Sequence, residues 1–80
     1  MEKSQVLQVI EHHVRRAAAI SADDNIDPQK KLIDYGLNSL DIVEVVSGSM
    51  RELKVRIPRT ELADIQNIDG LADKLIQYSN

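Results

Sequence analysis

The sequence predicts an all-α protein, a bundle of four helices in which the third is short and a long loop joins the first two. Three observations favour this fold. The chain has 80 residues, enough for one domain, which we take as residues 1–80. Hydrophobic residues make up 42% of it, but Trp and Phe are absent and Tyr occurs twice, so the core must be aliphatic, which favours helices over sheet. Apolar residues also recur at helical spacing in segments bounded by Pro or Gly.

The first predicted helix covers residues 3–20. Its apolar residues follow the i, i+3, i+4, i+7 spacing of an amphipathic helix: Val6, Leu7, Ile10, Val14, Ala17, Ala18 and Ile20. One side of this helix is therefore expected to face the core.

Residues 21–38 form the predicted long loop. The segment contains Pro28, Gly36 and most of the acidic residues without sustained periodicity, and it exceeds the usual connection of about four to six residues. Its apolar residues are expected to tuck under the loop and order it: Ile26, Leu32, Ile33 and Leu37.

The second helix is expected to start at Asn38 or Ser39 and to end near Leu53. Asn38 is a good N-cap, and Asp41 in the first turn favours the positive end of the helix dipole. At 100° per residue, the arc expected to be buried holds Ile42, Val43, Val46, Met50 and Leu53, and the opposite arc holds Asp41, Glu44, Gly48, Arg51 and Glu52. Gly48 costs roughly 1 kcal/mol against Ala in a helix, which indicates either a close neighbour at that face or a tolerated defect.

Pro58 prevents the second helix from continuing. A short third helix is expected over residues 60–65, with Thr60 as its cap and Leu62 and Ile65 facing inward. Asn67 caps the last helix, residues 68–78, whose expected buried side holds Ile68, Leu71, Ala72, Leu75 and Ile76.

Charge and composition exclude several classes of function. The net charge of −3 and the pI of about 5.2 argue against nucleic-acid binding and favour basic protein partners. The absence of cysteine excludes disulfides and any thiol chemistry supplied by the chain. The start of the chain lacks the layout of a signal peptide, and no apolar run reaches the 18 or more residues of a membrane span, so we expect a cytoplasmic protein without membrane insertion.

Residues 34–44, DYGLNSLDIVE, contain the most informative feature, a serine where a polar loop turns into an amphipathic helix. Ser39 is expected to be exposed and held in place there. The stretch resembles the attachment sequence of the acyl carrier protein family, and so do residues 26–28, Leu32 and residues 57–58 at matching places. The resemblance covers nearly the whole chain.

The resemblance implies a bundle of the acyl-carrier type in which Ser39 carries 4'-phosphopantetheine, derived from coenzyme A, whose thiol holds acyl groups as thioesters. It implies no catalytic activity, and we expect a monomer. The implied partners are a phosphopantetheinyl transferase and the acyltransferases, synthases and other enzymes of the pathway. A phosphodiester at Ser39 would also be favoured by the positive end of the second helix.

The positions that the resemblance assigns to partner recognition are Asn38, Leu40, Asp41, Glu44 and Glu52. The alternative for the carboxylates is a merely solvated helix face. Asn38 stands where the family usually has Asp, and several basic or neutral residues stand where housekeeping carriers are acidic: Met50, Arg51, Lys54, Arg56 and Arg59. We therefore expect a specialised pathway, such as polyketide synthesis, rather than housekeeping fatty acid synthesis. Ser47 and Ser49 are expected to reduce any pocket for a long acyl chain.

Other interpretations remain open on the sequence. The chain is alternatively a non-covalent helical interaction module with the carrier fold, or an aminoacyl or peptidyl carrier, although it lacks the Gly-Gly-x-Ser signature of peptidyl carriers. His12 and His13 lie about 100° apart on a helix, which favours a solvated face over a shared metal site. The basic residues from Arg51 to Arg59 form a docking surface, a small anion site or solubilising charge.

Overall fold

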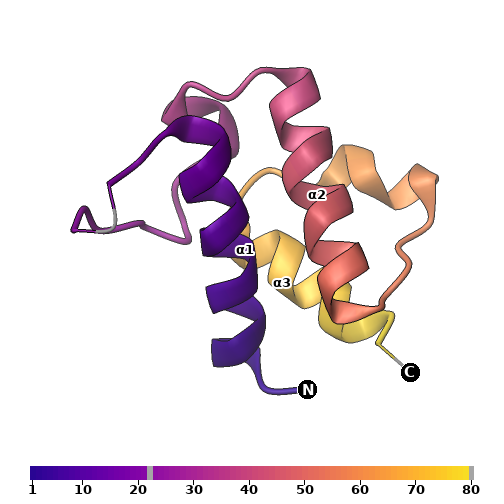
Figure 1. Cartoon of the computed structure of the whole chain (residues 1–80). Helices are drawn as coiled ribbons and strands as arrows, with labels where there is room; N and C mark the ends of the chain where they lie inside the picture. Colours follow the sequence, from indigo (N-terminus) through magenta and orange to yellow (C-terminus); the bar gives the residue numbers. More distant parts are fainter. Residues whose placement is uncertain (22, 80) are drawn as a thin grey trace.

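The computed structural model describes residues 1–21 and 23–79; Ala22, in the predicted loop, and Asn80 lie outside the description. The elements in order are α1 (Lys3–Ala18), the 3₁₀ helix η1 (Leu32–Tyr35), α2 (Ser39–Leu53), the 3₁₀ helix η2 (Arg59–Asp64) and α3 (Ile68–Gln77). Helices α1 and α2 run side by side in opposite directions, and α3 crosses them near the two termini (Figure 1). The described residues contain no strand, only one isolated bridge between Lys31 and Asn67. The predicted all-α bundle is confirmed, with η2 as its short third helix.

Helix α1 supplies the centre of the core through Val6, Ile10 and Val14, none of which is exposed. The helix ends at Ala18, two residues before the predicted end, because Ala19 turns into the left-handed region with φ of 55° and its N–H donates to Arg15 O. The core is aliphatic, as predicted. Its remaining members are Leu32, Leu37, Val45, Val46, Val55, Ile57, Ile65, Ile68, Leu71, Ala72 and Leu75.

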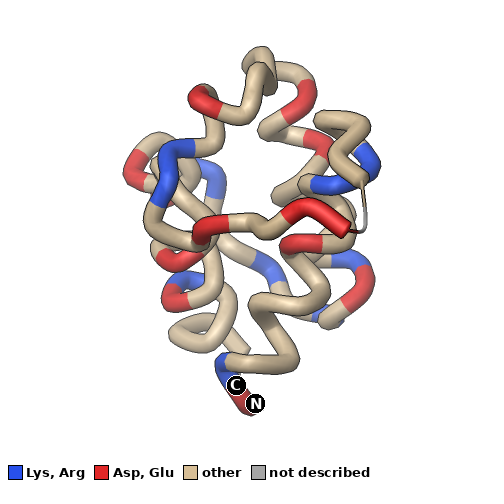
Figure 2. The backbone as a smooth tube through the Cα atoms, turned by 90° about the vertical axis from the view of Figure 1, so that its left-hand side faces the viewer, with Lys and Arg blue, Asp and Glu red and all other residues tan. Residues whose placement is uncertain are grey.

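The long loop is ordered by bonds at both ends. Arg15 Nη1 donates to the carbonyl oxygens of Ser21 and Asp24 at 2.6 and 2.7 Å. Leu32 N donates to Gln66 O at 2.8 Å, which ties the loop to the residues before α3. Figure 2 faces this loop and shows acidic positions along the segment after the grey trace, followed by a basic pair.

The apolar residues of the loop divide into inward and outward ones. Leu32 and Leu37 are buried and Ile26 is half-buried, as predicted. Ile33, expected to be tucked in, is 62% exposed. The reason is the 3₁₀ turn η1, which rotates each residue by about 120°, so that Leu32 points inward and Ile33 points away.

The buried side of α2 also differs from the prediction. Val46 is buried, and Ile42, Met50 and Leu53 pack partly against the core, but Val43 is 55% exposed. The buried side instead includes Val45, Gly48 and Ser49. Gly48, expected on the outward arc, is covered by the ring of His13 from α1: a Cβ built there would lie 2.7 Å from His13 Nδ1. The close neighbour is therefore confirmed.

The C-terminal part of the chain matches the prediction except at one cap and for helix ends that lie one residue earlier, at Asp64 and Gln77. Asn67 caps α3, because its Oδ1 accepts from Gly70 N at 2.6 Å. Thr60 does not cap η2: the helix begins one residue earlier, its N-cap is Pro58, and no side chain accepts there.

Glu61 holds η2 against α3. Its Oε1 accepts from Lys74 Nζ at 2.7 Å and from Tyr78 Oη at 3.2 Å. The hydrogen bond from Lys74, more than any other influence, lowers the pKa of Glu61 from its ordinary value of 4.5. Within this described cluster, burial and the bond to Glu61 raise the pKa of Tyr78.

Candidate functional site

Ser39 is the first residue of α2, and its position is set by a reciprocal cap. Asn38 has an extended backbone, and its Oδ1 accepts from Asp41 N at 2.8 Å. Asp41 Oδ2 accepts in return from Asn38 N at 3.1 Å. This capping box confirms the predicted helix start and fixes the backbone on both sides of the serine.

The loop before Ser39 is fixed as well. Gly36 has φ of 82°, a conformation that favours glycine, and it ends η1. Leu37 is 4% exposed and anchors the chain two residues before the serine. Tyr35 Oη donates to Asp27 O and accepts from Asp27 N, both at 2.8 Å. The serine therefore lies between a buried anchor and a capped helix.

The side chain of Ser39 is exposed, as are those of Asn38 and Leu40. The start of α2 lies at the end of the molecule away from both termini (Figure 1). The exposed serine therefore lies away from the chain ends. The free amide groups and the dipole at a helix start also favour a negatively charged substituent.

Two exposed apolar side chains of α2 lie near this polar position. Leu40 is 76% exposed and Val43, one turn further along α2, is 55% exposed. Large apolar side chains on a surface gain free energy when a partner covers them. The sequence placed Val43 in the predicted buried arc, so its exposure beside Ser39 was not expected.

The predicted recognition residues divide into two groups. The first group lies close to Ser39: Asn38 is the N-cap of α2, and Leu40, Asp41 and Glu44 lie in its first two turns. Glu52 lies 13 residues further, about 20 Å along the helix. Its Oε1 lies 3.0 Å from His13 Nε2, so this carboxylate bridges α2 to α1.

The sequence favoured a solvated face for His13, and the structure shows that this interpretation is wrong. Its side chain is only 18% exposed and lies between Gly48 and Glu52. The sequence does contain a signal for this contact: a histidine on one amphipathic helix and a glycine in the middle of the next one.

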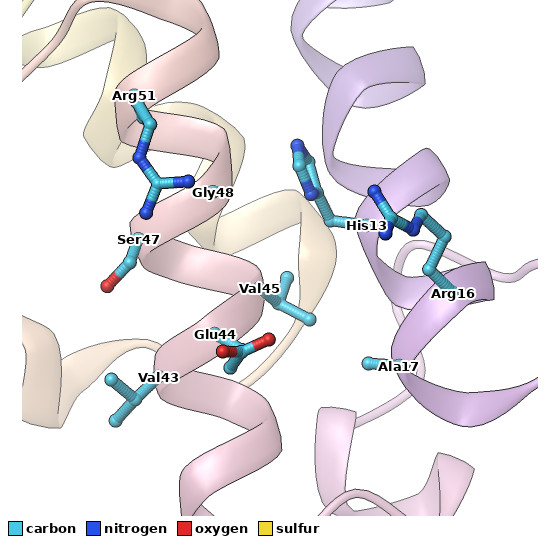
Figure 3. A pocket seen from close by; sticks show the side chains of 9 residues that line it. All are labelled: His13, Arg16, Ala17, Val43, Glu44, Val45, Ser47, Gly48 and Arg51. Carbon is cyan, nitrogen blue, oxygen red and sulfur yellow. The ribbon is translucent and has the colours of Figure 1, made fainter.

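A groove of about 510 Å³ runs between α1 and α2. In Figure 3, His13 and Arg16 reach into it from α1, and Glu44 and Val45 face them from α2. Ser39 does not line it. The described residues contain no group of three or more His, Cys, Asp or Glu that could hold a metal ion. Nor does this part of the chain include a helix long and apolar enough to cross a membrane.

The family model described as the phosphopantetheine attachment site matches residues 8–75, which include Ser39 and the whole capping box. The chain belongs to this family. Its fold is that of a solved structure, the curacin biosynthetic pathway HMG synthase in complex with an acetyl donor acyl carrier protein. The matched chain there is 34% identical, the TM-score is 0.82, and the match covers 100% of both chains.

Two curated relatives agree with this assignment. The polyketide biosynthesis acyl-carrier-protein AcpK of Bacillus subtilis (strain 168) is 27% identical over 75 residues, 94% of this chain and 92% of the relative. Aminoacyl carrier protein 1 of Bradyrhizobium diazoefficiens is 36% identical over 55 residues, 66% of this chain and 59% of the relative. The findings confirm an acyl carrier protein of the type used in specialised pathways, with 4'-phosphopantetheine as its cofactor.

Proposed function

We propose that Ser39 is the attachment residue for the phosphopantetheine group and that the chain delivers acyl groups from it as a non-catalytic, monomeric, cytoplasmic carrier. The observation that carries this proposal is the exposed serine at the first position of a helix whose cap and preceding loop are both fixed. The group supplies the thiol that a chain without cysteine lacks.

The residues around Ser39 suit this role. Asn38 and Asp41 hold the backbone through the capping box. Leu40 and Val43 offer apolar surface to an enzyme that covers the serine, and Glu44 adds an exposed negative charge one turn away. A phosphopantetheinyl transferase with a basic and partly apolar docking surface would match both features.

The test is incubation with coenzyme A, Mg²⁺ and a broad-specificity phosphopantetheinyl transferase, followed by intact-protein mass spectrometry. Wild-type protein is expected to gain one phosphopantetheine, and Ser39→Ala none. The control is Ser47→Ala, which removes another serine of α2. Ser47 lines the α1–α2 groove, and this variant is expected to behave as wild type. An adduct on Ser39→Ala, or none on wild type, would refute the proposal.

We further propose that the acyl group is short and that a condensing enzyme of the HMG synthase type accepts it. The support is the 34% identity over the full chain to the structure solved with an acetyl donor carrier, together with the polyketide relative. The test loads the protein with an acetyl-phosphopantetheine arm and measures transfer to the curacin-pathway synthase. Failure of transfer from a fully loaded protein would refute this assignment of the acyl group and the enzyme. The proposal that Ser39 carries the arm would be unaffected.

Aminoacyl cargo is the second candidate, favoured by the 36% identity to the aminoacyl carrier protein. It uses the same arm and differs in the enzyme that loads it. Loading of the free arm by an amino-acid-activating ligase, with no acetyl transfer to the synthase, would select this alternative.

A further inference from the structure

The C-terminal end of α2 carries positive charge that the carrier role of Ser39 does not use. A shallow groove of about 310 Å³ is lined there by Met50, Arg51, Lys54, Val55 and Arg56. We call it the basic groove. Three of its five lining residues are cations, and Met50 and Val55 supply apolar surface between them.

The cations of the basic groove are exposed and form no ion pair with the residues that the structure describes. Arg51, Lys54 and Arg56 are all exposed. The ion pairs found among residues 1–21 and 23–79 use Lys3, His13 and Lys74 instead. Neighbouring cations that are not paired with carboxylates repel one another. This cluster therefore does not stabilise the fold through ion pairs.

The backbone nevertheless holds the cations in fixed places. Val55 and Ile57 are buried at 6% and 4% exposure, so Arg56 between them must face outward. Lys54 adopts φ of 58° as the C-cap, and Val55 N donates to Met50 O at 3.0 Å. The groove is thus part of the ordered surface.

The two ends of α2 therefore differ in sign. Asp41 and Glu44 stand near Ser39, and the basic groove begins at Arg51, about 18 Å further along the helix axis. One exposed side of α2 carries residues from both ends of the helix: Leu40, Val43, Glu44 and Arg51. One partner lying along α2 would contact both charges.

We propose that the basic groove docks an acidic surface on the enzyme that accepts the acyl group, about 18 Å from the point where that enzyme receives the arm. This inference rests on the proposed function of Ser39. Charges of opposite sign at the two ends of α2 allow one orientation of the partner and disfavour the reverse one. A protein is favoured over a nucleic acid because the net charge of the chain is −3 and apolar side chains share the surface.

The test compares three matched pairs of substitutions. Arg51→Glu/Arg56→Glu reverses the basic groove. Lys30→Glu/Lys31→Glu makes the same change in the loop. Each single substitution lowers the charge by two, so either pair takes the net charge from −3 to −7. Arg51→Lys/Arg56→Lys keeps the charge, and Arg51→Gln/Arg56→Gln replaces the reversal if that variant fails to fold by circular dichroism.

Each variant is first converted with acetyl-coenzyme A and the broad-specificity transferase, which attaches the acetyl-phosphopantetheine arm, and the mass gain is measured. Equal loading of all variants verifies the proposed function separately. Acetyl transfer to the curacin-pathway HMG synthase is then measured at low and high salt. We expect kcat/KM to fall by about tenfold or more for the groove reversal, and the loss to shrink with added salt.

The loop reversal and the lysine variant are expected to stay within about twofold of wild type, because neither removes charge from the groove. Normal loading with equal transfer from both reversal variants would overturn the inference. So would absence of transfer from wild-type protein, or a gel shift of double-stranded DNA that depends on Arg51 and Arg56, which would assign the groove to nucleic acid.

Discussion

Gly48 and His13 set how closely α1 and α2 approach. The ring of His13 occupies the space that a side chain at position 48 would need, with 2.7 Å between its Nδ1 and an added Cβ. Rotating the ring away would break its 3.0 Å bond to Glu52. The mid-helix glycine therefore has a packing reason that outweighs its poor helix propensity.

Gly48→Ala is expected to lower the free energy of unfolding by about 1–2 kcal/mol, because overpacking exceeds the gain in helix propensity. In a His13→Ala background the same change is expected to stabilise by roughly 1 kcal/mol, since only the propensity gain remains. Urea unfolding of the four proteins in this cycle measures both effects. Equal effects in the two backgrounds would show that His13 does not cover position 48.

Ser49 places a hydroxyl in an aliphatic core. It is fully buried, and its Oγ has no hydrogen-bond partner in the described part of the structure. Ser49→Ala is expected to stabilise the fold by about 1 kcal/mol, because it removes a desolvated polar group and leaves little space behind. Val46→Ala, which deletes buried methyl groups from the same helix, is the control and should destabilise. Loss of stability in Ser49→Ala would indicate a partner for the hydroxyl.

Glu44 is exposed near Ser39 and is expected to attract the transferase. Glu44→Lys should lower the kcat/KM of phosphopantetheine transfer by about tenfold and leave the thermal unfolding midpoint nearly unchanged. Asp23→Lys makes the same change in charge on the loop and should have a smaller effect. Unchanged transfer together with a collapsed circular dichroism spectrum would place Glu44 on the packed side of α2.

At the scale of elements, the attachment of η2 to α3 depends on pH. The folded pKa of Glu61 lies below its ordinary value of 4.5, chiefly because Lys74 donates to it. The ionised carboxylate therefore stabilises the fold above pH 4.5, and this stability is lost as the pH falls through the folded pKa. Docking of η2 should weaken in acid.

Thermal unfolding midpoints between about pH 6 and pH 3 measure this dependence. Glu61→Gln is expected to flatten the fall below pH 4.5, because the amide cannot titrate. Glu2→Gln, at an exposed position before α1, should keep the wild-type profile. Identical profiles for wild type and Glu61→Gln would mean that this contact does not form in solution.

Features set by nearby residues were predictable from the sequence. Asn38 and Asn67 cap their helices through bonds that reach only three residues along the chain, so local patterns identify them. The exposure of Ile33 and Val43 was not predictable, because it depends on the turn of η1 and on which side of α2 packs against the rest of the bundle. Helical periodicity places apolar residues on one side but does not say which of them a neighbouring helix covers.

At the scale of the whole molecule, the fold separates stability from function. Helices α1 and α3 supply most of the fully buried residues of the core, and the long loop is tied to α1 and to the start of α3. This leaves the start of α2 free to present Ser39 at the end away from the termini (Figure 1). Family membership shows a carrier, and in this arrangement the proposed attachment residue is exposed while the core stays buried.

The most direct test of this account is to locate the phosphopantetheine group within the modified protein. Trypsin together with a glutamate-specific protease releases residues 32–44, in which Ser39 is the only serine, and separates them from residues 45–51, which contain Ser47 and Ser49. Mass spectrometry is predicted to find the added group on residues 32–44 alone. The group on any other fragment would contradict the assignment of Ser39.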